Sequence, residues 1–273
     1  MKILKKSTYT IIILILFVIQ AYPVLWLIIS SFRGNIDLSI KPFSFPTSLT
    51  LDNYINVIAK SNVFLYMKNS TVVTTISLII IVIFSSMASF AISKFNFKWS
   101  NKVYSYFLIG LTIPYAVTLI PLFVMYTHIH LIDTLFGLML PLIAFSLPVS
   151  VLLFVNFYRF VPNEIIEAAI IDGCSIYQVY FKIMMPLSLN TILTVLSMNF
   201  IFVWNDYIFS LIFINSTNMK TISLGLQDFI GSHGLTDWGG TFASICVTTL
   251  PTLIIYFALN KKVASGMTLG AIK

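Results

Sequence analysis

The chain of 273 residues is 58% hydrophobic and 9% charged, with a mean hydropathy of +0.96 and a formal net charge of +7. Soluble domains carry about 25% charged residues, so this composition excludes an ordinary soluble protein. It predicts an all-α, polytopic membrane protein. The positive charge is therefore not taken as a sign of nucleic-acid binding, because in a membrane protein the distribution of Lys and Arg among the loops decides its meaning.

Six uncharged segments are long enough to cross a hydrocarbon core, which needs about 20 helical residues. They are residues 7–32, 71–93, 103–126, 134–158, 183–205 and 241–260. The first segment is too long for the apolar core of a signal peptide and lacks a small-residue cleavage pattern. We therefore expect six transmembrane helices, the first of them retained.

Lys and Arg are distributed unequally between the two sides of these six segments. One side carries Lys2, Lys5, Lys6, Lys94, Lys98, Lys102, Arg159, Lys182, Lys261, Lys262 and Lys273, and the other carries Arg33, Lys41, Lys60, Lys68 and Lys220. Because positive loops stay in the cytoplasm, we expect both termini and the loop after the fourth span to be cytoplasmic.

That loop, residues 159–187, is the longest polar interruption in the second half of the chain. Pro162 cannot lie in a helix interior, and Asn163 is expected to cap a helix that runs to about Ile171. Glu167 lies near the start of this helix, where the helix dipole favours negative charge.

A hinge is expected after this first helix. Asp172 and Gly173 end it, because glycine accepts the left-handed conformation found at helix C-termini. Ser175 is expected to cap a second helix, which should be interrupted at Pro186. On this pattern alone, the loop could equally be a plain connector between two spans.

The string Glu167-Ala168-Ala169, followed by Asp172-Gly173 and then Pro186, resembles the EAA loop of bacterial ABC importer permeases. In that family the loop forms a pair of short cytoplasmic helices seated in a groove of the ATPase subunit. The resemblance implies that Glu167, Ala168, Ala169, Asp172, Gly173 and Pro186 couple the permease to the ATPase. Cys174 and Asn190 depart from the family pattern, but neither lies in the hinge. A solvated helix face is the alternative role for Glu167.

Further strings resemble the carbohydrate branch of these permeases, which includes maltose and multiple-sugar importers. They are LDNY from Leu51, WNDYIFSLIF from Trp204 and GMTLGAIK from Gly266. His130 stands where the branch often has glycine. The resemblance implies the ABC importer type-1 permease fold. It also implies that Gly266, Thr268 and Gly270 contact the ATPase, although a disordered terminus is the alternative.

The same resemblance implies four parts: a cytoplasmic N-terminus and first span (1–32), an extracytoplasmic loop (33–68), the permease domain (69–260) and a cytoplasmic tail (261–273). The implied setting is a sugar importer of the bacterial cytoplasmic membrane. Its other components would be a second homologous permease in a heterodimer, two ATPase subunits and an extracytoplasmic sugar-binding protein. The substrate would be a sugar or oligosaccharide.

The sequence carries no nucleotide-binding motif. Gly234 and Gly239 have the spacing of a phosphate-binding loop, but Gly240 stands where that motif requires lysine. We therefore expect no cofactor and no enzymatic activity in this chain, with ATP and Mg²⁺ bound by the separate ATPase. Cys174 and Cys246 do not indicate a disulfide framework, and the pair of His128 and His130 is too small for a metal site.

Trp204, Asn205, Asp206 and Tyr207 are candidates for the solute path. Asp206 interrupts a long apolar run, and ionisable groups inside spans commonly face a cavity or a partner. Aromatic faces beside amide and carboxylate groups also suit sugars. The alternative is a structural or gating role, with Asp206 at the outer boundary of one long helix through residues 183–214.

Two other classes of transporter remain as alternatives. A secondary transporter should show internal repeats and buried charge relays, which this sequence lacks. A permease for amino acids or peptides would also carry an EAA loop, but the strings at Trp204 and Gly266 favour the carbohydrate branch.

Overall fold

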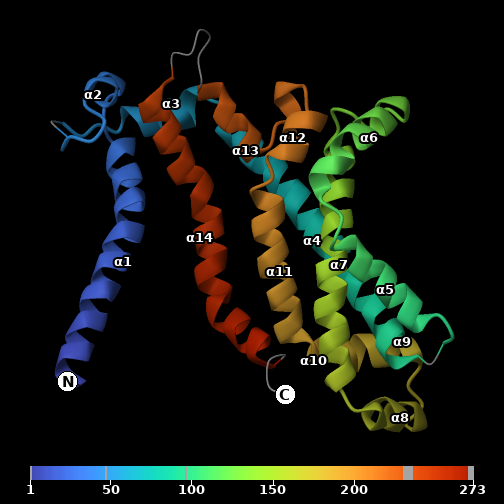
Figure 1. Cartoon of the computed structure of the whole chain (residues 1–273). Coiled ribbons are helices and arrows are strands. Elements are labelled where there is room, and N and C mark those ends of the chain that lie inside the picture. Colours follow the sequence, from blue (N-terminus) through green and yellow to red (C-terminus); the bar gives the residue numbers. More distant parts are fainter. Residues whose placement is uncertain (1, 47, 96, 230–235, 270–273) are drawn as a thin grey trace. The chain divides into compact units, whose positions relative to one another are not determined.

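The computed structural model describes residues 2–46, 48–95, 97–229 and 236–269, and the regular elements within them are helices (Figure 1). The prediction of an all-α chain is confirmed for these residues. The chain divides into two compact units. The first comprises Met1–Leu65 and Gly225–Leu250, and the second comprises Tyr66–Leu224 and Pro251–Lys273.

Four continuous helices are long and apolar enough to cross a membrane, and two further pairs of bent helices meet the same test if each pair counts as one span. The four are α1 (Lys2–Ser31), α4 (Val63–Lys94), α7 (Leu135–Phe160) and α14 (Trp238–Leu269). The described part of the chain thus accounts for the six predicted spans, and the protein is a multi-pass membrane protein.

The third predicted span, residues 103–126, is not one straight helix. It consists of α5 (Ser100–Gly110) and α6 (Tyr115–His128), which are bent by 95° relative to each other. Pro114 occupies the N-cap position of α6, and because proline lacks an N–H it cannot continue the hydrogen bonds of α5. Proline 121, 141, 148 and 251 are accommodated inside helices.

The fifth predicted span is also bent. α9 (Ile176–Val179), a π turn (Tyr180–Met184) and α10 (Met185–Leu187) lead to Ser188, where the axis turns by 72° into α11 (Leu189–Trp204). The expected continuation to residue 214 is wrong, because α11 ends at Trp204 and α12 begins only at Ile208. Further short helices in the described part of the chain are α12 (Ile208–Phe213), η2 (Thr217–Met219), α13 (Ile222–Gly225) and η3 (Leu226–Phe229).

In the first unit, the polar segment after α1 folds into a small ordered structure and is not a plain loop. It contains α2 (Asn35–Ile40) and α3 (Asp52–Lys60). Trp26 of α1 stacks on Phe43 and makes an edge contact with Phe242, with ring centroids 5.6 and 5.1 Å apart. These contacts hold the segment against the C-terminal end of α1 and the N-terminal end of α14.

Arg33 organises this segment from its centre, where its side chain is only 1% exposed. Its Nε donates to the Asp37 carboxylate at 2.8 Å, and its other nitrogens donate to the carbonyls of Pro42 and Lys41 and to the Ser44 hydroxyl. A buried guanidinium is stable only when its donors are paired in this way. Asn53 adds two bonds from its amide, to the carbonyls of Ser31 and Arg33, each 2.8 Å long.

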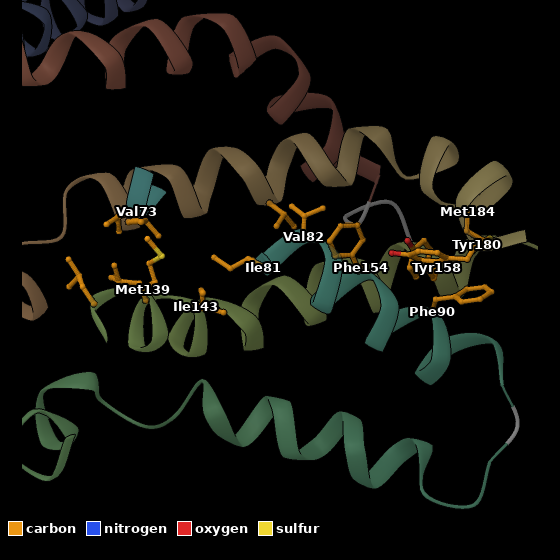
Figure 2. Packing of buried hydrophobic residues seen from close by; sticks show 14 of the residues in the cluster. Val73, Ile81, Val82, Phe90, Met139, Ile143, Phe154, Tyr158, Tyr180 and Met184 are labelled. Carbon is orange, nitrogen blue, oxygen red and sulfur yellow. The ribbon is translucent and has the colours of Figure 1, made fainter. Parts of the chain in front are cut away.

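In the second unit, α7 is the central helix, and α4, α5, α11 and α12 pack against it. The core that they form is shown in Figure 2, where Val73, Met139 and Ile143 lie toward one end and Phe90, Tyr158 and Tyr180 cluster at the other. The rings of Phe90 and Tyr180 are 5.5 Å apart. Because lipid is as apolar as this core, the side chains stabilise the unit mainly through close van der Waals packing between the helices.

The connection between α6 and α7 is held by Asp133. Its carboxylate accepts hydrogen bonds from the backbone N–H groups of Asn215 and Ser216, at 2.9 and 2.8 Å, and its own N–H donates to the Phe213 carbonyl. Asp133 and His130 both adopt left-handed conformations, with φ of +61° and +56°. That conformation explains why glycine would suit position 130.

We expect replacement of Asp133 by alanine to destabilise the second unit by roughly 2 kcal/mol, because two N–H groups lose a charged acceptor and alanine tolerates φ of +61° poorly. Asp133→Gly, which relieves the backbone conformation, should recover only part of this loss. Thermal unfolding in detergent measures both. A melting temperature equal to that of the wild type for Asp133→Ala would contradict the role of this carboxylate.

The same contact should depend on pH. Burial alone would raise the pKa of Asp133, but the hydrogen bonds from Ser216 and Asn215 lower it below its usual value of 3.8. The stabilisation is therefore complete above pH 3.8 and is lost as the pH falls through the lower pKa of the folded state. The difference in melting temperature between wild type and Asp133→Asn should be constant around neutral pH. It should shrink only as the pH falls below 3.8.

Candidate functional site

The first half of the loop 159–187 folds largely as its sequence predicts. Helix α8 (Asn163–Ile171) ends at Asp172, and Gly173 follows with φ of +85°. The predicted N-cap is wrong: Pro162 occupies that position and Asn163 is the first helical residue. The reason is that the Asn163 side chain accepts a hydrogen bond from Lys94 Nζ at 3.0 Å and does not cap its own helix.

The second half of the loop begins with the predicted cap. The Ser175 hydroxyl accepts from the N–H of Gln178, and the Gln178 side chain accepts from the N–H of Ser175, which together form a capping box. The helix is not interrupted at Pro186. A π turn immediately before it, with the Met185 N–H bonded to the Tyr180 carbonyl, widens the backbone so that the proline ring is accommodated.

Two contacts join this loop to α4. Lys94 Nζ, at the end of α4, donates to the Val161 carbonyl as well as to Asn163. The hydroxyls of Tyr180 and Ser86 share a buried hydrogen bond of 2.6 Å. Both halves of the loop are thus tied to the same helix. The sequence indicated neither contact, because Lys94 was notable only as one positive charge at a helix end.

The turn between α8 and α9 presents apolar side chains outward. Ile171 is 84% exposed, and Ile170 and Tyr177 are also exposed. Glu167, Ala168 and Asp172, in the same helix and turn, are exposed as well. We call these residues the exposed turn face. An apolar face of this kind, edged by two carboxylates, has the character of a surface that another protein covers.

The two alanines of the loop occupy different environments. Ala168 is exposed, whereas Ala169 is buried together with Ile166 against the hydrophobic core of the second unit. Of the pair, only Ala168 lies where a partner surface could approach. Ala169 instead lies between α8 and the core, where its small side chain fits.

The second group of predicted residues, 204–207, forms the break between α11 and α12. The Asp206 carboxylate accepts from the backbone N–H groups of Phe209 and Ser210 and from the Ser210 hydroxyl, at 3.2, 3.0 and 2.9 Å. The Asn205 amide donates to the Ile201 carbonyl. Of the roles left open by the sequence, these bonds favour the structural one for Asp206, which ends one helix and starts the next.

Burial raises the pKa of Asp206, although the hydrogen bonds from Ser210 and Phe209 act in the opposite direction. Thr221 donates in turn to the Ser210 hydroxyl at 3.0 Å. The chain Thr221–Ser210–Asp206 therefore fixes the orientation of the carboxylate within the protein.

Trp204 lies in an aromatic and apolar environment. It is buried, its ring stacks on Phe200 at 5.5 Å, and both rings line an open groove of about 490 Å³ in the second unit. The wall from α4 contributes threonines to a largely apolar surface, and the hydroxyl of Thr74 is buried without a hydrogen-bond partner in the described chain. The lining includes Met67, Thr71, Thr74, Thr75, Phe200, Trp204, Pro251 and Ile254.

A buried polar contact that the sequence did not indicate lies beside this groove. Asn199 of α11 donates to the Ser150 hydroxyl of α7 at 3.0 Å and to the Val195 carbonyl at 2.8 Å. In the sequence, the only indication of this contact was a polar asparagine inside an otherwise apolar helix.

The remaining predicted positions are only partly described. α14 continues as a helix through Gly266 and Thr268 to Leu269, and Gly270 lies outside the described residues. Within the described ranges, no group of three or more His, Cys, Asp or Glu side chains lies close enough to hold a metal ion.

The chain is similar to known membrane transport proteins. A family model described as "Binding-protein-dependent transport system inner membrane component" matches residues 80–269. An ABC transporter permease protein of Caldicellulosiruptor sp. is 38% identical over 269 residues, covering 98% of this chain and 97% of the relative. The diacetylchitobiose uptake system permease protein of Streptomyces coelicolor is 29% identical over 257 residues, covering 94% and 85%.

Among solved structures, the fold is similar to a chain of a bacterial ABC transporter involved in the import of the acidic polysaccharide alginate. The TM-score is 0.80 at 18% sequence identity, with 94% of this chain and 96% of that chain covered. At this identity the likeness concerns the fold, and it extends over almost the whole chain.

Proposed function

This chain belongs to the family of binding-protein-dependent transport system inner membrane components, and from this we propose that it is one permease subunit of an ATP-driven importer of sugars or oligosaccharides. As a membrane permease component, it is not the enzyme of such a system; ATP hydrolysis belongs to a separate subunit. The carbohydrate class is supported by the diacetylchitobiose permease relative and by the strings at Trp204 and Gly266.

The observation that carries the coupling part of the proposal is the exposed turn face. Ile171 and Tyr177 project from a turn whose two helices are tied to α4 through Lys94 and Tyr180. A partner that bound this face would therefore move α4 together with the loop. We propose that the ATPase covers it, so that closure of the ATPase pair moves the attached spans as rigid elements. Glu167 is placed to make a charged contact there.

The groove beside Trp204 supports a role in solute passage. Its aromatic pair, Phe200 and Trp204, offers flat apolar faces, and its threonines offer hydroxyls. Sugars bind to such combinations through their C–H faces and hydroxyl groups. Asn205, Asp206 and Tyr207 follow Trp204 in the break after α11, where Asp206 supports the backbone.

The remaining components follow from the family and from charge. We propose a heterodimer with a second, homologous permease, two ATPase subunits that bind ATP and Mg²⁺, and an extracytoplasmic binding protein that delivers the sugar. The excess of Lys and Arg around the loop 159–187 supports a cytoplasmic location for both termini and for this loop. The segment from Gly266 to Gly270 would then reach the ATPase as well.

Uptake into proteoliposomes tests the function directly. The chain would be reconstituted with its partner permease, the ATPase and the binding protein, and supplied outside with labelled oligosaccharides, amino acids or peptides. We expect accumulation of oligosaccharides only, and only with ATP inside and the binding protein outside. Uptake that needs an ion gradient in place of ATP would indicate a secondary transporter, and uptake of peptides or amino acids would overturn the carbohydrate assignment.

A further inference from the structure

A polar cavity lies where the end of α4, the start of α5 and the end of α7 meet, all within the second unit (Figure 1). Its volume is about 470 Å³, and its lining includes Ser93, Phe97, Lys98, Ser100, Asn101 and Arg159. It is separate from the groove beside Trp204 and from the exposed turn face, and the proposed transport function leaves it without a role.

The cavity carries unneutralised positive charge. Lys98 and Arg159 both line it, and in the described part of the chain neither has an acidic partner. The Arg159 guanidinium lies over the ring of Tyr104, 4.9 Å from its centroid, which holds it at the cavity without cancelling its charge. Lys102 lies close by, over the ring of Trp99. The described lining contains no carboxylate.

Uncharged donors complete the site. α5 is 11 residues long, and Trp99 at its N-cap position offers no side-chain acceptor to the first N–H groups of the helix. Those N–H groups, and the helix dipole, favour an anion at this end. Independently, the Ser93 hydroxyl on the cavity wall is buried without a hydrogen-bond partner in the described chain. The Ser100 N–H already donates to the Phe97 carbonyl, so a phosphate oxygen would accept from the N–H groups that follow it in the first turn of α5.

The surroundings of the cavity are those of a lipid interface. None of the residues of α5 is buried, and Val103, Tyr106 and Ile109 are 36%, 76% and 59% exposed on its outward surface. Trp99, at the foot of the helix, is 58% exposed. Exposed aromatic residues beside basic ones are typical of the boundary between hydrocarbon and headgroups. An acyl chain that lay along α5 would bring its phosphate to the cavity.

We propose that this cavity binds the phosphate group of an anionic phospholipid, held by Lys98, Arg159 and the N-terminus of α5. Basic pockets between membrane helices on the cytoplasmic side bind such headgroups, and the excess of Lys and Arg supports this side for the cavity. The lipid would hold the end of α4 against α7, next to Lys94 and the loop 159–187. The inference concerns the membrane environment and does not depend on which solute is transported.

Native mass spectrometry of the full-length chain in neutral detergent tests the proposal, with phosphatidylglycerol and phosphatidylcholine as the probes. We expect selective retention of phosphatidylglycerol. Binding should weaken about thirtyfold in the double variant Lys98→Gln/Arg159→Gln, because each of the two basic residues near the headgroup contributes about 1 kcal/mol to binding. The matched control is Lys41→Gln/Lys68→Gln, which removes the same charge from exposed positions outside the cavity and should bind as the wild type does.

A footprinting measurement on the wild-type chain needs no variant. Phosphatidylglycerol in nanodiscs should protect Lys98 from acylation, with Lys41 as the unprotected internal reference. Equal binding of both lipids by wild type, or unchanged phosphatidylglycerol binding in the double variant, would overturn the proposal. So would equal protection by inorganic phosphate alone, which would assign the cavity to a free anion. If the ATPase protected Lys98 in nanodiscs of phosphatidylcholine alone, Lys98 would be a contact with the ATPase. That result would also overturn the proposal.

Discussion

Gly173→Val is expected to abolish the stimulation of ATP hydrolysis by the sugar-loaded binding protein while leaving the complex assembled. Gly173 has φ of +85°, a conformation that costs an ordinary residue about 1–2 kcal/mol and a β-branched residue more. Valine would therefore shift the backbone between α8 and α9 and displace Ile171 and Tyr177 from the face that we propose the ATPase covers. The measurement is ATPase activity of the reconstituted complex, with and without binding protein and sugar.

The open space around Gly173 allows a matched control. A Cβ at this position would meet no atom within 4 Å, so the penalty comes from the backbone conformation and not from steric contact with neighbours. Gly173→Asn, which tolerates the left-handed conformation, should keep most of the stimulation. Full stimulation in the valine variant would mean that the loop is only a connector, and loss in both variants would point to the side chain itself blocking the partner.

Arg33→Met is expected to cause the largest loss of stability, roughly 3 kcal/mol, because it leaves the Asp37 carboxylate unpaired and removes the donor that holds three further oxygen atoms. A loss of this size should lower the melting temperature by roughly 10 °C for a chain of this length. Arg33→Lys should also lose stability, because a single ammonium group cannot reproduce the planar set of donors. Thermal unfolding in detergent, followed by the fluorescence of the tryptophans, measures these effects.

Two controls separate the buried contact from a general effect of charge. Lys41 is exposed, so Lys41→Ala should change the melting temperature little. In the double variant Arg33→Met/Asp37→Leu the unpaired carboxylate is also removed, and part of the loss should be recovered. If Arg33→Met unfolded at the same temperature as Lys41→Ala, the segment after α1 would not depend on the buried guanidinium.

Much of the architecture could be predicted from local chemistry. The uncharged runs located all six candidate spans, because a bilayer admits only long apolar helices whose backbone bonds are internal. The hinge of the loop 159–187 was also predictable, since Gly173 and the capping pair of Ser175 and Gln178 act through bonds between near neighbours. The resemblance of the loop to ABC importer permeases agreed with the family match.

The errors in the sequence-based predictions occurred where distant contacts compete with local ones. Asn163 has the chemistry of a helix cap, but Lys94, 69 positions away, takes its side chain. Asp206 appeared to interrupt one long helix, and its bonds to Phe209 and Ser210 instead start a new one. The bends at Pro114 and Ser188 likewise depend on how the flanking helices pack.

By itself, the sequence determined that this protein is a multi-pass helical membrane protein with a hinged polar loop, because hydropathy, capping and glycine conformation are properties of short segments. Only the tertiary structure decided which loop residues face outward, as with Ala168 and Ala169. It also brought Lys98 and Arg159, 61 positions apart, to one cavity. Such pairings depend on the packing of α4, α5 and α7 around a shared core, which no local pattern encodes.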